Sequence, residues 1–91
     1  MDTANQEKRL AMIAIIVENF DSVEKLNKLI HENGQYVIGR MGLPCRERGM
    51  SLISIALDAP SDVISSLSGK LGMLPGVSAK TVYAKTQTVQ L

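Results

Sequence analysis

The chain has 91 residues, of which 45% are hydrophobic and 21% are charged, and its net charge is +1. This length allows a single domain with a modest core, and the near-neutral charge lacks the bias of a protein whose main partner is a nucleic acid or an acidic substrate. The single cysteine excludes an internal disulfide, and the polar opening MDTANQEKRL differs from a secretory signal, so we expect a cytoplasmic protein. No apolar run reaches the ~20 residues that span a membrane, so we expect no membrane segment.

The first part of the chain predicts a tail, a strand and a helix. Residues 1–7 lack apolar periodicity and are predicted to form a frayed N-terminal tail. The run LAMIAIIV, residues 10–17, predicts a strand that is buried on both faces. Asp21 is followed three residues later by Glu24, as in a capping box, and apolar residues then recur on one face until an Asn-Gly pair. This pattern predicts an amphipathic helix that is capped by Asp21.

The middle of the chain predicts a hairpin. Two β-branched or apolar runs, QYVIGRMG at 35–42 and GMSLISIALD at 49–58, lie on either side of LPCRER at 43–48. Such a pattern is typical of two antiparallel strands with a connecting loop.

The last third predicts a helix, a strand and a tail. A second helix begins at Pro60-Ser61 and ends in GMLPG at 72–76, and GVSAKTVYAK at 76–85 reads as the last strand. The segment TQTVQL, residues 86–91, is a C-terminal tail or a short edge strand. The order of elements within residues 8–85 predicts an α+β, ferredoxin-like βαββαβ sandwich, with a four-stranded antiparallel sheet and two helices on one face.

The sheet face away from the helices is predicted to be apolar. Alternate residues on both sides of the first and third strands lack charge, so a single chain would leave one apolar face in water. We therefore expect a homo-oligomer, either a dimer or a tetramer, that packs sheet against sheet or joins edge strands. The predicted oligomer interface consists of Met12, Ala14, Ile16, Leu52 and Ser54.

The sequence lacks the residues that several activities associated with this topology require. RNA-recognition domains stack bases on aromatic side chains of the third strand, but here that strand is aliphatic, so we expect no direct nucleic-acid binding. The loop after the first strand, ENFD, is acidic where a phosphate-binding enzyme would need basic residues. His31 and Cys45 are the only histidine and cysteine, too few for a structural zinc site, and we expect no metal and no cofactor.

The segment GRMGLPCRERG, residues 39–49, is the candidate binding site. Its glycines allow close approach of another chain or a ligand, and its arginines can present planar forks to carboxylate or phosphate. Its charges are also consistent with an ordinary hairpin whose charged edges prevent aggregation. If it is a functional site, it either forms subunit contacts or binds an anionic small molecule or another regulatory protein. The candidate residues are Gly39, Arg40, Gly42, Leu43, Pro44, Arg46, Glu47, Arg48 and Gly49.

Four segments resemble the iron-only hydrogenase system regulator family: IAIIVEN, SVEKLNKLIHENG, IGRMGLPCRERGMSLISIALD and LSGKLGMLPGVSAK. The resemblance covers the chain from about Lys8 to Lys85. It implies a fold similar to ACT-type regulatory domains and to the C-terminal domain of nickel-responsive repressors, which oligomerise and bind small effectors at subunit interfaces. The repressors hold metal through several histidines and a cysteine, and with one of each here the metal role does not transfer.

The leading hypothesis is a non-catalytic, homo-oligomeric regulatory domain that senses a small ligand or binds a partner protein. If it regulates transcription, it acts through another protein, because the chain has no room for a DNA-reading element. The alternatives are a small enzyme or thiol-redox protein that uses Cys45, and a structural assembly scaffold.

Overall fold

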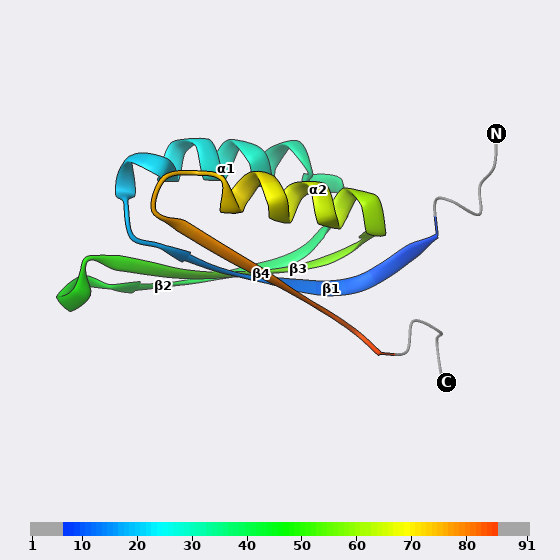
Figure 1. Cartoon of the computed structure of the whole chain (residues 1–91). Coiled ribbons are helices and arrows are strands. Elements are labelled where there is room, and N and C mark those ends of the chain that lie inside the picture. Colours follow the sequence, from blue (N-terminus) through cyan, green and yellow to red (C-terminus); the bar gives the residue numbers. More distant parts are fainter. Residues whose placement is uncertain (1–6, 86–91) are drawn as a thin grey trace.

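The computed structural model describes residues 7–85 as one sheet covered by two helices (Figure 1). The predicted tail at 86–91, and all but the last residue of the tail at 1–7, lie outside this range. The main elements are β1 (Lys8–Val17), α1 (Val23–Glu32), β2 (Val37–Cys45), β3 (Met50–Pro60), α2 (Ser61–Gly72) and β4 (Val77–Tyr83). The strands are antiparallel in the order β2-β3-β1-β4. These observations confirm the predicted α+β, ferredoxin-like fold.

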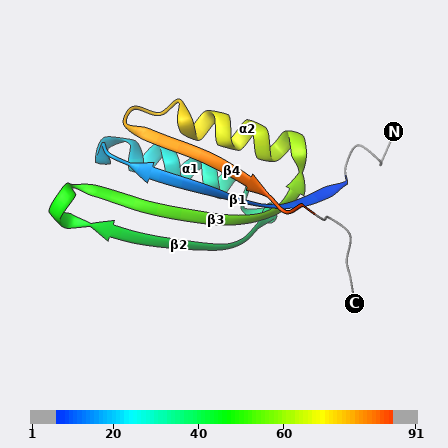
Figure 2. The ribbon, with the colours of Figure 1, turned by 60° about the horizontal axis from the view of Figure 1, so that its bottom comes forward.

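Both helices lie on one side of the sheet (Figures 1 and 2). The core forms between them and the sheet, because alternate residues of β1 from Ala11 to Val17 and of β3 from Ile53 to Ala59 point to the helices and are apolar. Ile13 and Ile55, which are register partners, are fully buried there, as are Leu26 of α1 and Ile64 of α2. Within residues 7–85 no helix has the length and apolar character needed to span a membrane.

A single chain buries only one face of β1. Ile13, Ile15 and their neighbours on the helix side are buried, whereas Met12 and Ile16 on the opposite side are 49% and 41% exposed. The predicted burial of both faces is therefore not reached within one chain, because both helices pack on the same side of the sheet.

The start of α1 differs from the prediction. The backbone N–H of Asp21 donates to Oδ1 of Asn19 at 2.9 Å, so Asn19 is the capping residue and Asp21 is not. A 3-10 turn, η2 (Phe20–Ser22), comes next, and α1 begins only at Val23. The prediction of an Asp21 cap was wrong, because Asn19 caps the turn η2 and Ser22, the N-cap residue of α1, makes no side-chain capping hydrogen bond.

The hairpin between β2 and β3 is tighter than predicted. Leu43, Pro44 and Cys45 were assigned to the loop, but all three extend β2 and pair with β3. A proline is tolerated at this position because β2 is an edge strand. Only the 3-10 turn η4 (Arg46–Arg48) and Gly49, with φ 63°, connect the strands.

The loops after β1 and after α2 are joined at one end of the sheet. The N–H of Glu18 donates to the carbonyl of Gly76 at 2.7 Å, and the buried Ser22 Oγ donates to the carbonyl of Pro75 at 2.6 Å. Gly76 has φ 68°, and a Cβ at this position would lie 2.6 Å from Cβ of Asn19. A glycine is therefore required where these loops meet.

Candidate functional site

The sheet side opposite the helices carries an apolar surface, called the open face here. Eight of the ten exposed large hydrophobic residues within 7–85 belong to it, with exposed fractions of 41% to 67%. Its register positions also include the small residues Ala14, Ser54 and Ala56. The eight large residues are Leu10, Met12 and Ile16 of β1, Ile38, Met41 and Leu43 of β2, Leu52 of β3 and Val82 of β4.

The open face contains all five residues that the sequence predicted for an oligomer interface. Alternation places Met12, Ala14 and Ile16 on one side of β1, and antiparallel register sets Ala14 opposite Ser54 and Ile16 opposite Leu52. The fold therefore brings the predicted interface residues together as one surface.

Four further contributors, three on β2 and one on β4, were not predicted. Met41 and Leu43 of β2 follow simple alternation, but Leu43 was assigned to the ligand site and Met41 was not selected. Ile38 lies at a β-bulge between Val37 and Gly39, where the register shifts, so alternation could not place it. Val82 alternates with Lys80 and Ser78, a pattern that gave no apolar signal.

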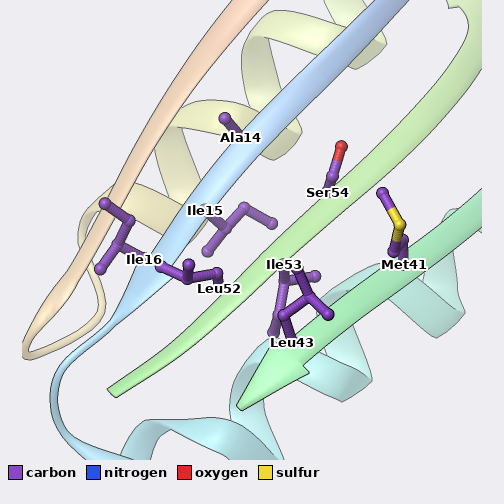
Figure 3. A pocket seen from close by; sticks show the side chains of 8 residues that line it. All are labelled: Ala14, Ile15, Ile16, Met41, Leu43, Leu52, Ile53 and Ser54. Atoms are coloured by element: carbon purple, nitrogen blue, oxygen red, sulfur yellow. The ribbon is translucent and has the colours of Figure 1, made fainter. Parts of the chain in front are cut away.

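Two shallow hollows interrupt the open face. The first, of about 240 Å³, is lined by side chains of β1, β2 and β3, with Ala14 and Ser54 on one side and Leu43 on the other (Figure 3). The second, of about 300 Å³, lies toward the other end of the strands and is lined by Leu10, Met12 and other apolar side chains. Such surfaces suit apolar contacts and offer few hydrogen-bonding groups.

The predicted arginine cluster of the hairpin is divided in two. Nη2 of Arg40 donates to Oδ1 of Asn27 on α1 at 2.7 Å, so Arg40 lies at the helix side of the sheet. Arg46 and Arg48 lie in η4, beyond the end of β2. Since Arg40 precedes Cys45 by five residues of strand, about 17 Å separates it from the turn. One ligand of small size cannot contact all three arginines in a single chain.

The other candidate residues of the hairpin are also distributed. Gly42 pairs with Ile53 and Pro44 with Ser51, which are helix-side positions, whereas Leu43 belongs to the open face. Gly39 lies at the bulge opposite Ala56 on the open face. Glu47 and Gly49 lie in the exposed turn with the two arginines.

Cysteine and histidine side chains are not gathered into a centre. Cys45 is a half-buried free thiol at the end of β2, opposite Met50, and His31 is exposed in the last turn of α1. In residues 7–85 no group of three or more histidine, cysteine or acidic side chains is placed to hold a metal ion.

Fold and site together define a small ferredoxin-like domain with an uncovered apolar sheet face. The family described as "TM1266-like: Iron-only hydrogenase system regulator, putative" matches residues 9–81. The chain belongs to this family, which confirms the resemblance seen in the sequence.

Solved structures of the same fold agree with this assignment. The chain is similar to the uncharacterized protein TM1266 from Thermotoga maritima, with 38% identity, a TM-score of 0.83, and coverage of 87% of this chain and 100% of that one. The C-terminal domain of the MgtC protein from Mycobacterium tuberculosis matches at 11% identity and TM-score 0.67, over 92% of this chain and 96% of that one. A formyltetrahydrofolate deformylase from Pseudomonas putida matches at 11% identity and TM-score 0.59, over 80% of this chain and 28% of that one. At 11% identity these last two show a shared fold only. No curated protein matches the sequence.

Proposed function

We propose that this chain is a non-catalytic regulatory protein of the iron-only hydrogenase system that works as a homo-oligomer, a dimer or a tetramer paired through the open face. Membership of the family supports the link to the hydrogenase system. The observation that carries the oligomer is the gathering of exposed large apolar side chains on one side of the sheet.

The free energy available from covering the open face is large enough for stable pairing. Full burial of a large apolar side chain contributes about 1.5–3 kcal/mol, and the eight side chains here are roughly half-exposed, so each still has about 0.7–1.5 kcal/mol to gain. Two copies together gain about 12–24 kcal/mol gross. Association itself costs about 4–15 kcal/mol, so the middle of the two ranges leaves roughly 8 kcal/mol, which corresponds to a micromolar Kd.

Association of copies also provides an equilibrium on which a regulator can act. A small ligand or another protein changes that equilibrium when it binds one state better than the other. Two features support such binding: the apolar hollows of the open face, and the exposed η4 turn, where Arg46 and Arg48 can pair with carboxylate or phosphate. Any effect on transcription then passes through another protein.

A matched pair of substitutions tests the proposal. Met12 lies on the open face, whereas Met73, which is 85% exposed, follows α2 and lies outside it. We expect the wild type and Met73→Glu to sediment as dimers or tetramers at micromolar concentration. Met12→Glu should sediment as a folded monomer, because pairing would bury its carboxylate in an apolar contact.

Circular dichroism checks that the Met12→Glu variant keeps its fold, which is expected because Met12 is half-exposed in the single chain. An associated Met12→Glu variant, with the same mass as the wild type, would show that pairing does not use the open face.

A further inference from the structure

The register of the strands arranges the open face in three rows that cross the sheet. The first and third rows hold most of the large apolar side chains, and the middle row has the small residues Ser54 and Ala14 at its centre, directly opposite each other. The rows are Leu43, Leu52, Ile16 and Ser78; Met41, Ser54, Ala14 and Lys80; and Ile38, Ala56, Met12 and Val82.

The dimensions of this surface fit a second sheet better than a single helix. Four strands about 4.8 Å apart and about eight residues long cover a width of ~19 Å and a length of ~26 Å. A helix is about 10 Å wide and would leave half of the width in water. The flat area is roughly 500 Å² per copy, or about 1,000 Å² for two copies before the relief of the side chains is counted, which reaches the lower limit of a biological interface. A second copy supplies a surface of the same size.

The charges of the face also favour a second copy. Within the three rows Lys80 is the only charged residue, and it lies on the edge strand β4. Asp58 lies one row beyond the third row, opposite Leu10. A surface with one cation and one anion at its margins has no net charge that would attract a strongly acidic or basic partner. The same surface on a second copy is equally free of net charge and is therefore matched to it.

We propose that two copies pack sheet against sheet about a two-fold axis that passes over Ala14 and Ser54. This proposal rests on the proposed function and specifies where its interface is centred. Sheets pack about 10 Å apart, and small side chains at the centre allow the closest approach of the two backbones. In a two-fold interface, residues at the axis meet the same residues of the second copy.

This arrangement has two consequences for the side chains. The large residues of the outer rows, such as Leu52 and Met12, interdigitate with those of the second copy on either side of the axis. Ser54, whose hydroxyl is a polar group in the middle of an apolar surface, meets a second hydroxyl with which it can form a hydrogen bond.

Cysteine cross-linking tests where the centre lies. In a Cys45→Ser background, the test cysteines are Ser54→Cys and Ala14→Cys, alone and as a mixture of the two chains. Ser78→Cys at the margin of the open face and Ser65→Cys on the exposed surface of α2 are the controls. Diamide is the oxidant and takes up the two electrons and two protons released when two thiols form a disulfide. The readout is the rate at which a covalent dimer appears on a non-reducing gel.

A disulfide requires the two Cα atoms to lie within about 7 Å, which is less than the usual ~10 Å between packed sheets. Only residues close to the axis qualify, and only where small side chains bring the two backbones closer than usual, as this arrangement requires at Ala14 and Ser54. We expect at least one of the central cysteine variants to form the covalent dimer about tenfold faster, or more, than both control variants. If the variants sediment as dimers and no central test exceeds the controls, this inference is overturned while the proposed pairing stands. If the Cys45→Ser chain sediments as a monomer, both are overturned.

Discussion

The junction between the two loops at Gly76 gives a sharp test of the structure. Gly76 and Gly49 both have positive φ, at 68° and 63°, so an alanine at either position is strained by its backbone. They differ in surroundings. A Cβ on Gly76 would lie 2.6 Å from Cβ and 3.0 Å from N of Asn19, whereas a Cβ on Gly49 meets nothing within 4 Å.

The expected losses in unfolding free energy follow from this difference. The left-handed conformation costs alanine about 1–2 kcal/mol, and about 0.4–1 kcal/mol is recovered because alanine restricts the unfolded chain. Gly49→Ala should therefore lose about 1 kcal/mol. Gly76→Ala adds about 1–3 kcal/mol of overpacking and about 1 kcal/mol for the hydrogen bond from Glu18 N–H, which the displaced loop weakens, so its loss should reach about 3–5 kcal/mol.

Urea unfolding measures both losses. All variants must be compared at one protein concentration, because association adds to apparent stability. Equal losses for Gly76→Ala and Gly49→Ala would refute the close contact between the two loops.

Two further predictions concern Ser22 and the hairpin. Ser22→Ala should lose about 1–2 kcal/mol in the same urea assay, because it removes the 2.6 Å hydrogen bond to the Pro75 carbonyl at a site that is 3% exposed, and an unchanged midpoint would contradict the bond. In cells that depend on this regulator, Cys45→Ser should leave hydrogenase activity unchanged, whereas joint replacement of Arg46 and Arg48 by alanine should alter it. The reverse result would favour thiol chemistry at Cys45.

Most of the fold could be predicted because its signals are local and agree with one another. The short apolar runs LAMIAIIV and SLISIALD identify β1 and β3, and the absence of charge on either side of these strands predicts an apolar open face. Pro60 and Ser61 mark the turn into α2, which begins at Ser61. The same patterns identify Met12 and Ile16 as surface residues of this face.

Other features depend on contacts that the sequence does not encode locally. Asn19 caps the turn before α1, in a loop that is held against Gly76 by the hydrogen bond from the Glu18 N–H. The capping-box spacing of Asp21 and Glu24 therefore pointed to the wrong capping residue. Gly39 accompanies a bulge that moves Ile38 onto the open face. Such shifts arise from pairing between strands and cannot be derived from one strand alone.

The arginines show the same limitation at the scale of the site. Their closeness in sequence predicted one anionic ligand site, but an extended strand separates residues quickly. Arg40 is bound to Asn27 of α1, and Arg46 and Arg48 are left together in the turn.

The mass of the native protein in solution tests the central claim most directly. Sedimentation equilibrium over a range of micromolar concentrations should give two or four times the 9.9 kDa of one chain. A mass of 9.9 kDa throughout that range would mean that the apolar open face stays uncovered by a second copy, and regulation through association of copies would then be ruled out.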